Sequence, residues 1–244
     1  MIALVTAFPM ELAPLTKGWR QKYISGRYTV YYSTINSVSV YVLVTGMGFE
    51  HAKNAVTSFI QKHSMKYIIA TGYAGGLDSK ISHGDLIVAN KILGFNSTSM
   101  NNSLYSKEEL FHNLKNSNVK NLTIHNGPLI SSTQIISETN QKQEFSSLGI
   151  ALDMESFAVA QVAEGNGIPW GAVRVITDIW NETLPFDFSK HQSSNGQINY
   201  IKVILSTIKQ PSKIKNLLRL GKYSKLATQN LTNYWQNIIP KLPA

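Results

Sequence analysis

The chain has 244 residues and contains no cysteine. This absence excludes disulfides, thiolate nucleophiles and cysteine-based zinc sites. The six histidines lie far apart in the sequence, and no two of them have the His-x-x-x-His spacing of a zinc-binding helix. The composition therefore argues against a metalloenzyme, and we expect neither a metal nor any other cofactor.

Long apolar runs are also missing. No stretch approaches the roughly 20 consecutive apolar residues that a membrane-spanning helix requires. The first residues, Met1–Ala7, have neither the basic flank nor the long apolar core of a signal peptide. We therefore expect a cytoplasmic protein without a transmembrane segment.

Acidic residues are absent from one part of the chain. Residues 201–244 contain eight lysines and arginines but no aspartate or glutamate, whereas the rest of the chain is nearly neutral. The net charge of +9 thus belongs largely to this carboxy-terminal segment. Because a nucleic-acid enzyme more often carries basic residues around its site, we expect no nucleic-acid partner.

Short β-branched apolar runs alternate with segments of helical periodicity over residues 1–178. Strands are predicted at residues 2–7, 28–34, 38–45, 67–72, 85–90, 129–130 and 171–177. Helices are predicted at residues 50–63 and from residue 153 onward, and the polar, asparagine-rich stretch 96–126 is predicted to be irregular. This order indicates an α/β fold with helices on the faces of a sheet.

Four acidic residues lie where predicted strands end or a helix begins: Glu11, Asp153, Glu155 and Asp178. Functional sites of α/β folds lie at such strand ends. Carboxylates suit the cleavage of a glycosidic bond, which requires an activated water, a protonated leaving group and stabilisation of a cationic sugar. Acids at a helix start also serve as caps, and we assign Asp153 to that role.

Three motifs carry a resemblance to a known family. They are Thr71–Leu77 (TGYAGGL) followed by His83–Val88 (HGDLIV), Leu152–Ser156 (LDMES), and Val173–Asp178 (VRVITD). In this order and spacing, over residues 1–182, they resemble the nucleoside phosphorylase/nucleosidase superfamily, and within it the 5′-methylthioadenosine/S-adenosylhomocysteine nucleosidases. The chain also resembles the hopanoid-associated nucleosidases, including its tail in residues 183–185 and 216–222. The resemblance implies a three-layer α/β fold with a central mixed β-sheet flanked by helices.

The resemblance also implies roles for the acids. Asp178 would donate a proton or hydrogen bond to purine N7, Glu11 would deprotonate the attacking water, and Glu155 would bind the ribose hydroxyls. The other positions that it implies in substrate binding are Phe8, Tyr73, Gly75, Ile135, Ile136, Met154, Arg174 and Thr177. Tyr73 stands where these nucleosidases usually carry a small residue, so its phenol narrows the pocket or adds a hydroxyl contact. Arg174 has a second interpretation, as the partner that orients a nearby carboxylate.

The implied activity is that of a purine nucleosidase, which releases adenine from a 5′-substituted adenosine of the methylthioadenosine or adenosylhomocysteine type, or from a lipid-linked adenosine such as adenosylhopane. Hydrolysis is favoured over phosphorolysis because the chain has only four arginines, none in a glycine-rich loop, and because Glu11 would repel phosphate. A phosphorylase with Lys53 as the missing cation is one alternative. A non-catalytic nucleoside-binding protein is a second alternative, and Tyr73 and the unusual tail are compatible with it.

The basic tail suggests a division of the chain. We expect a nucleosidase-like domain at residues 1–210 and a basic, amphipathic, helical extension at residues 211–244 that packs on it. The extension has two interpretations: it packs on the domain or on a sister subunit, or its basic, aromatic face rests on an anionic membrane surface. The family resemblance implies a homodimer.

Overall fold

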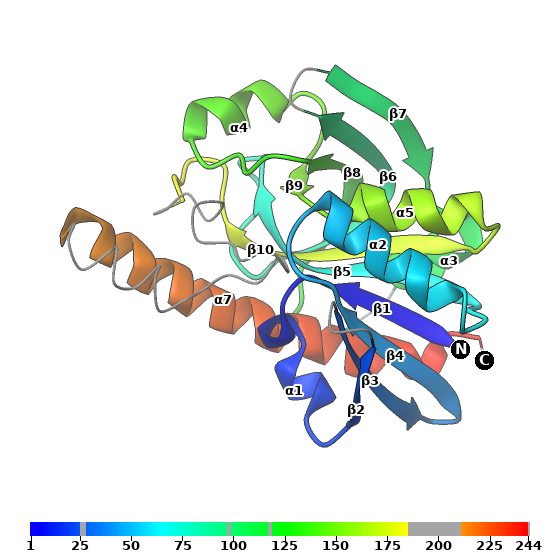
Figure 1. The fold of residues 1–244 in the computed structure, drawn as a ribbon. Helices are drawn as coiled ribbons and strands as arrows, with labels where there is room; N and C mark the ends of the chain where they lie inside the picture. The colour runs from blue at the N-terminus through cyan, green and yellow to red at the C-terminus, as the bar shows by residue number, and fades with distance from the viewer. Residues whose placement is uncertain (25–27, 97–98, 117–118, 185–210, 244) are drawn as a thin grey trace.

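The computed structural model describes residues 1–24, 28–96, 99–116, 119–184 and 211–243 (Figure 1). Its strands are β1 (Ile2–Thr6), β2 (Arg20–Ile24), β3 (Tyr28–Ile35), β4 (Val38–Val44), β5 (Tyr67–Gly76), β6 (Leu86–Asn96), β7 (Ser99–Tyr105), β8 (Ile124–Ser132), β9 (Ala151–Asp153) and β10 (Trp170–Asp178). Its α-helices are α1 (Ala13–Thr16), α2 (Phe49–Ile60), α3 (Glu108–Lys115), α4 (Thr139–Phe145), α5 (Ser156–Gly165) and α7 (Pro211–Ile238). Two short 3₁₀ helices are η1 (Pro9–Glu11) and η3 (Ile239–Lys241).

These strands form one mixed sheet. Its order is β10-β6-β8-β9-β5-β1-β4-β3-β2, with β7 attached to β6 and a further pairing between β10 and β5. Because β5 pairs with both β9 and β10, the strands β5, β10, β6, β8 and β9 form a closed ring of pairings. β1, β5 and β10 run parallel to one another, whereas β6 runs antiparallel to β10. The carboxyl ends of β1, β5 and β10 therefore lie at the same edge of the sheet.

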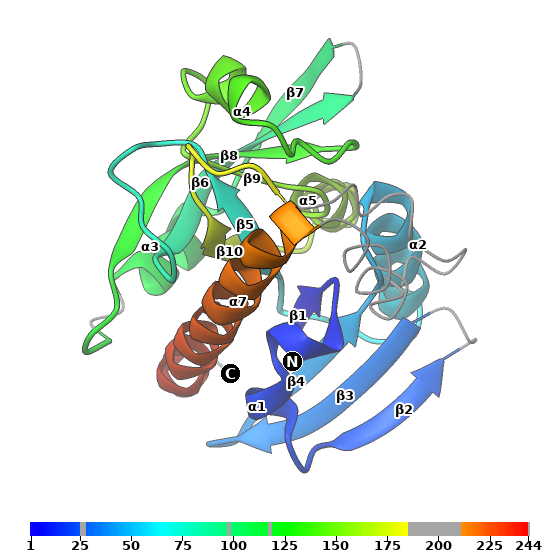
Figure 2. The ribbon, with the colours of Figure 1, turned by 90° about the vertical axis from the view of Figure 1, so that its left-hand side faces the viewer.

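Helices cover the sheet on both faces, so the molecule has three layers (Figure 1 and Figure 2). Residues of β1 alternate between two apolar cores. Ala3 and Val5 belong to the core that includes α2 and α5, and Ile2 and Leu4 belong to the core that includes α3 and α7. A strand that is buried on both faces requires this alternation. The predicted α/β class, with a mixed sheet between helices, is confirmed.

The prediction of an irregular stretch at residues 96–126 is wrong. Part of it forms β7, which pairs antiparallel with β6, and part of it forms α3. Leu110 and Leu114 are four positions apart and are 1% and 0% exposed, so they form the apolar face that holds α3 on the sheet. β7 forms although its sequence is polar, because β10 pairs with only Leu86–Val88 and leaves the rest of that edge of β6 free.

The carboxy-terminal segment forms one long helix, α7, and the second half of this helix is part of the core. The apolar residues that it buries are no more than 1% exposed: Ala227, Leu231, Tyr234, Trp235 and Ile238. The indole N–H of Trp235 also donates to the hydroxyl of Thr71, on β5, at 3.0 Å. This half packs on the domain, as the first interpretation of the tail expects. The boundary after residue 210 stays a prediction, because residues 185–210 lie outside the described residues.

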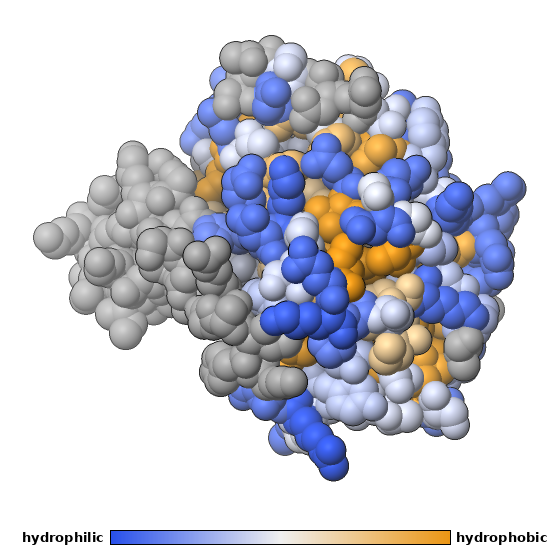
Figure 3. Space-filling model, turned by 45° about the vertical axis from the view of Figure 1, so that its right-hand side comes forward, coloured by the Kyte–Doolittle hydropathy of each residue, from blue (hydrophilic) through white to orange (hydrophobic). Residues whose placement is uncertain are grey.

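The surface is polar over much of the molecule. On the face shown in Figure 3, apolar side chains gather near the centre and polar side chains surround them. No helix in the described part of the chain has both the length and the apolar character needed to span a membrane.

Candidate active site

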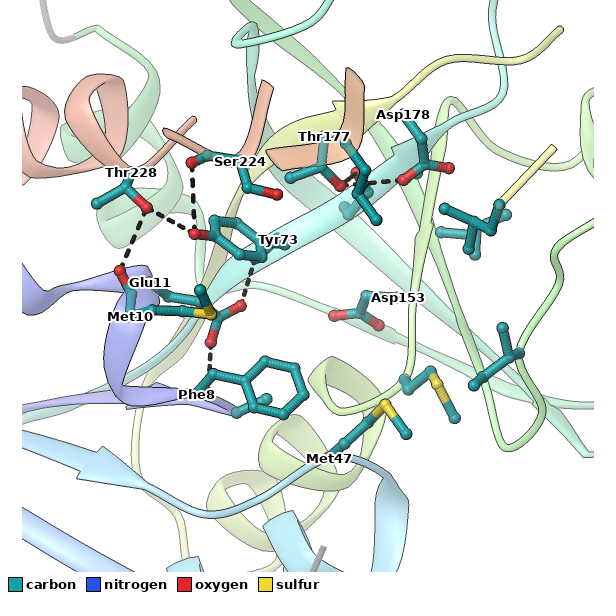
Figure 4. Close-up of a pocket in the computed structure, with 18 of the residues that line it drawn as sticks. Phe8, Met10, Glu11, Met47, Tyr73, Asp153, Thr177, Asp178, Ser224 and Thr228 are labelled. Carbon is teal, nitrogen blue, oxygen red and sulfur yellow. Dashed lines mark hydrogen bonds between the residues drawn. The ribbon is translucent and has the colours of Figure 1, made fainter. Parts of the chain in front are cut away.

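A cavity of about 440 Å³ lies at the sheet edge where β1, β5 and β10 end (Figure 4). Pockets for small organic ligands have volumes of this order, and they are mostly apolar with a few placed polar groups. The wall of this cavity fits that description. Its polar and charged side chains are Glu11, Tyr73, Asp153, Glu155, Thr177, Asp178, Ser224, Lys225 and Thr228.

All of the predicted site residues except Arg174 line this cavity. They reach it from η1 and the residues after β1, from β5, from the loop before α4, from the turn between β9 and α5, and from β10. The three acids Glu11, Glu155 and Asp178 thus lie around one space, although they are far apart in the sequence. Their catalytic and binding roles stay predictions.

Glu11 is held at one end of the cavity by uncharged donors, and it is only 2% exposed. One carboxylate oxygen accepts a hydrogen bond from the Tyr73 N–H at 2.7 Å. The other accepts from the Phe8 N–H at 2.7 Å and from the Thr6 hydroxyl. Burial raises the pKa of the Glu11 carboxyl, while these hydrogen bonds and the charge of Arg174 act in the opposite direction. The result is a fixed carboxylate with more than ordinary basicity.

Gly72 makes room for this carboxylate. Its φ of +134° is a backbone conformation that residues with a side chain rarely adopt. A Cβ at this position would overlap Glu11 Oε1 and would lie 3.0 Å from Arg174 Nη1. A larger residue would therefore push Glu11 or Arg174 aside, and the site itself requires the first glycine of the motif.

Arg174 lies behind the cavity, where it contacts the acids. Its guanidinium donates to the Thr71 carbonyl at 3.1 Å and to the Ser156 hydroxyl at 2.9 Å and 3.1 Å. It forms an ion pair with Asp153, and its Nη2 lies 3.7 Å from Glu155 Oε2. This placement favours the second interpretation of Arg174, in which it orients carboxylates and does not contact the substrate.

Glu155 lies immediately before α5 and is 6% exposed. Its Oε1 accepts a hydrogen bond from the Gly48 N–H at 2.7 Å. Burial raises the pKa of the Glu155 carboxyl to about 7, with the Arg174 charge opposing the rise and the Asp153 charge adding to it. Asp153 accepts from the Ser156 N–H at 3.2 Å and pairs with Arg174, whereas the residue at the N-cap position of α5 is Glu155, so Asp153 is not the N-cap that the sequence predicts.

Asp178 ends β10 at the opposite side of the cavity and is 7% exposed. The Thr177 hydroxyl donates to its Oδ1 at 3.0 Å, and the Lys142 ammonium donates to its Oδ2 at 2.5 Å. Gly75 leaves space for the carboxylate, because a Cβ there would lie 2.9 Å from Asp178 Oδ2. Sequence reasoning misses Lys142, since a single lysine in a short polar helix carries no pattern that marks it as buried.

Sequence reasoning also misses the contribution of α7. Between residues 217 and 228, this helix presents one face to the cavity, at spacings of three and four residues: Leu217, Leu220, Gly221, Ser224, Lys225 and Thr228. The Tyr73 hydroxyl is hydrogen-bonded to the Thr228 hydroxyl at 2.6 Å and donates to the Ser224 carbonyl at 3.4 Å (Figure 4). The phenol is therefore turned toward α7. The helical spacing is visible in the sequence, but the surface that it faces is not.

Positive charge is scarce around the cavity. Among the described residues that line it, Lys225 alone carries a positive side chain. The guanidinium of Arg174 is occupied by its ion pair and hydrogen bonds, and Lys53 is exposed on α2 outside the cavity wall. The described residues contain no cluster of three or more side chains suited to hold a metal ion. What the arrangement offers a bound ligand is a set of carboxylates for proton transfer and hydrogen bonding.

Comparisons with known proteins identify the family of the chain. The sequence model of the phosphorylase superfamily matches residues 1–209. The 5′-methylthioadenosine/S-adenosylhomocysteine nucleosidase of Staphylococcus haemolyticus is 27% identical over 209 residues, covering 78% of this chain and 91% of that protein. The nucleosidase of the same name from Maridesulfovibrio salexigens is 24% identical over 203 residues, covering 76% of this chain and 87% of that protein.

Solved structures share the fold. The 5′-methylthioadenosine/S-adenosylhomocysteine nucleosidase of Helicobacter pylori, with butyl-thio-DADMe-Immucillin-A, has a TM-score of 0.77 at 17% identity and covers 99% of this chain and 98% of its own. The futalosine hydrolase of the same organism has a TM-score of 0.76 at 17% identity and covers 99% of this chain and 97% of its own. The likeness to the hopanoid-associated branch stays a prediction. Because the family model matches most of its length, the chain belongs to the phosphorylase superfamily.

Proposed function

We propose that the protein is a purine nucleosidase that hydrolyses the N-glycosidic bond of a 5′-substituted adenosine and releases adenine. The observation that carries this proposal is the convergence of Glu11, Glu155 and Asp178 on one cavity of nucleoside size. The relatives named for methylthioadenosine and adenosylhomocysteine support the substrate class, since both compounds are adenosines with a thioether at the 5′ position.

Glu11 is the proposed general base. A water between Glu11 and the sugar C1′ gives its proton to the carboxylate while its oxygen forms the new bond to C1′. The pKa of Glu11 is raised by burial, so the carboxylate accepts a proton more readily than an exposed glutamate does. Its fixed hydrogen bonds to Phe8 and Tyr73 keep it aimed at one point, which lowers the entropic cost of the attack.

Asp178 is the proposed acid for the leaving base. As the C1′–N9 bond breaks, its electron pair goes to the purine, and a proton delivered by Asp178 to N7 allows adenine to leave as a neutral molecule. Ile135 and Ile136 also line the cavity, and we propose that they bind the faces of the base. Gly75 allows Asp178 to approach the base without a side chain between them.

Glu155 is the proposed ligand of the ribose hydroxyls. Positive charge develops at C1′ in the transition state, and the hydroxyls become stronger donors to a carboxylate as it does so. Glu155 can act in this way because Arg174 and the Gly48 N–H stabilise its charged form within the protein. Met154 lies beside it in the wall and supplies an apolar contact for the sugar.

Hydrolysis is the proposed reaction, rather than phosphorolysis. The buried Glu11 carboxylate would repel a phosphate dianion at the point of attack, and the guanidinium of Arg174 is already paired with Asp153. Lys53 lies outside the cavity wall, so it does not supply the missing charge. Lys225, the one positive side chain among the described residues of the wall, is exposed on α7.

The wall facing the 5′ position is proposed to be apolar. Met47 is packed with apolar side chains from several elements, which all line the cavity: Phe8, Ile135, Met154, Leu217 and Leu220. A thioether with a methyl or a longer alkyl group would bury its apolar surface here, at about 0.8 kcal/mol per CH₂ group. A lipid-linked adenosine such as adenosylhopane stays a candidate on the same ground.

Partners and location are further proposals. We propose a homodimer, because a closed symmetric pair is the common state of soluble enzymes and because an apolar area lies on one face of the molecule (Figure 3). We also propose that α7 touches an anionic membrane surface through its basic residues, which include Lys215 and Lys222. The proposed location of the protein is the cytoplasm.

A nucleoside panel tests the proposed function. The wild-type protein is incubated with methylthioadenosine, adenosylhomocysteine, a 5′-alkyl adenosine and inosine, each with and without phosphate, and free base is measured by chromatography. We expect adenine from the 5′-substituted adenosines at rates that phosphate does not change. Release that requires phosphate would establish the phosphorylase alternative, and binding without turnover on every nucleoside would establish a binding protein.

A further inference from the structure

Lys142 is the least expected charged residue near the cavity. It lies on α4, is 1% exposed, and does not itself line the cavity wall. Burial of an ammonium group costs several kcal/mol unless every donor finds a partner. A lysine buried directly behind the proposed acid therefore needs an acceptor for each of its donors.

Every donor of this ammonium group has an acceptor. Lys142 Nζ lies 2.5 Å from Asp178 Oδ2, 2.9 Å from the Ile179 carbonyl and 3.0 Å from the Glu182 carbonyl. A lysine has three N–H donors, so all of them are used. The three acceptors belong to the end of β10 and the turn after it. One side chain of α4 thus fixes both the proposed acid and the backbone that carries it.

A second contact joins the same two segments of the chain. The Leu184 N–H donates to the Ser137 carbonyl at 3.0 Å. Leu184 lines the cavity, and so do Ile135 and Ile136, which precede Ser137. The segment proposed to bind the base and the segment that carries Asp178 are therefore fastened together, with Lys142 as the only charged link between them among the contacts of the described residues.

On the basis of the proposed function, we propose that Lys142 is the positioning residue of the leaving-group acid. Its ammonium holds Asp178 Oδ2 while the Thr177 hydroxyl holds Oδ1, so the carboxyl group has one fixed orientation. Each carboxyl oxygen has two lone-pair positions, so one position stays available to carry the proton that Asp178 gives to purine N7. The orientation of the acid is thereby set before the substrate binds, and this reduces the entropic cost of proton transfer.

A double-mutant cycle tests this role. The four proteins are the wild type, Lys142→Met, Asp178→Asn and the double variant, with Lys62→Met as the control that removes an exposed lysine after α2. The kcat and KM for methylthioadenosine are measured for each. Methionine keeps the length and volume of the lysine and removes its charge and donors. A residue that acts only through Asp178 has nothing further to contribute once that acid is gone.

The expected result separates kcat from KM. Lys142→Met should lose about 10²-fold in kcat with KM changed less than about threefold, and Lys62→Met should match the wild type. The double variant should have the kcat of Asp178→Asn to within about threefold. An unchanged kcat in Lys142→Met, or a double variant whose loss is the product of the two single losses, would overturn the role of Lys142. A wild type without turnover on any nucleoside would overturn the proposed function and this role with it.

Melting temperatures of all variants accompany the kinetics, because Lys142→Met leaves a carboxylate buried without its cation. Should that variant be unfolded at the assay temperature, the comparison of Asp178→Asn with the double variant carries the test, since the double variant buries neither charge. Equal kcat values in these two proteins support the proposal. A further loss of about tenfold in the double variant contradicts it.

Discussion

The two ends of the cavity hold their acids in different ways. At one end, Glu11 accepts hydrogen bonds from uncharged groups, namely two backbone N–H groups and the Thr6 hydroxyl. At the other end, Asp178 accepts from the Thr177 hydroxyl and from the buried ammonium of Lys142. Two carboxylates of the same cavity thus have different surroundings, and surroundings decide which proton each one gives or takes.

The difference also concerns where the supporting groups come from. Thr6 and Phe8 are within five residues of Glu11, so the nucleophile end is built mostly from local contacts, completed by Tyr73 of β5. The leaving-group end depends on Lys142, which lies 36 residues before Asp178. Substitutions in segments far from the acids in the sequence, such as α4, should therefore affect the leaving-group end more than the nucleophile end.

The largest expected effect comes from Asp178→Asn. The amide preserves the shape of the side chain but has no proton to give to N7, so kcat should fall by about 10³-fold while the affinity for adenine stays within about threefold. Steady-state kinetics with methylthioadenosine and calorimetric titration with adenine measure the two quantities. Thr177→Ser retains the hydroxyl donor and serves as the matched control. A kcat close to that of the wild type would remove Asp178 from the mechanism.

Glu11→Gln should lose about 10²-fold in kcat at little change in KM, because the amide cannot take a proton from water. Glu50→Gln, on the exposed first turn of α2, is the control. The comparison of the two ends is broken if Glu11→Gln keeps the kcat of the wild type. In that case, Glu11 would not act on the nucleophile.

Gly72→Ala should disturb Glu11 and its neighbour Arg174 and leave the leaving-group end unchanged. The added Cβ would overlap Glu11 Oε1 in a backbone conformation that alanine avoids, so we expect a loss of about tenfold in kcat and a lower melting temperature. Gly165→Ala, at the end of α5, meets no atom within 4 Å and is the control, which should keep wild-type kinetics. If Gly72→Ala retained full activity, the position of Glu11 would not limit the rate.

Leu217→Ala should weaken the binding of substrates with long 5′-alkyl groups, with KM raised about fivefold, and should change the KM for adenosine less than about twofold. Leu218→Ala is the matched control, because this neighbour is 70% exposed and does not line the cavity. The measurement is a series of KM values against alkyl chain length. Equal losses for all chain lengths would mean that α7 does not contact the 5′ substituent.

The smallest expected effect is on stability. The pKa of Glu155 is raised from 4.5 to about 7 by burial, so its contribution to stability is complete below pH 4.5 and is lost as pH rises through about 7. Glu155→Gln removes this titration and can still accept from the Gly48 N–H. Between pH 5 and pH 8, the melting temperature of the wild type should fall by about 2–6 °C more than that of Glu155→Gln. Parallel pH profiles would contradict the raised pKa.

Much of the fold could be predicted from local pattern. The alternation within the apolar strands and the motif glycines identify the sheet and the edge where the acids lie, and the structure agrees. The Asn- and Ser-rich strand β7 could not be predicted, because its pairing depends on a free edge of β6 and not on its own side chains. β9 has only three residues, Ala151–Asp153, which is too short for a periodic signal.

The acids could be predicted in the same way, but their supporting groups could not. The sequence allows two interpretations of Arg174, as a substrate ligand or as a partner that orients a carboxylate. Its contacts with Asp153 and Ser156 favour the second. Lys142 has no sequence signal, because its burial depends on how α4 lies against the end of β10. The sequence pattern predicts that the tail is an extension outside the domain, yet α7 supplies cavity residues such as Leu220. Contacts between distant segments are where sequence pattern carries least information.

The most direct test of the account is the identity of the sugar formed from methylthioadenosine in the presence of phosphate. Mass spectrometry of the wild-type reaction should show free methylthioribose as the sugar product, formed at the same rate with and without phosphate, because the Glu11 carboxylate directs water and repels a phosphate anion. A phosphorylated sugar, or adenine release that begins only when phosphate is added, would contradict the account.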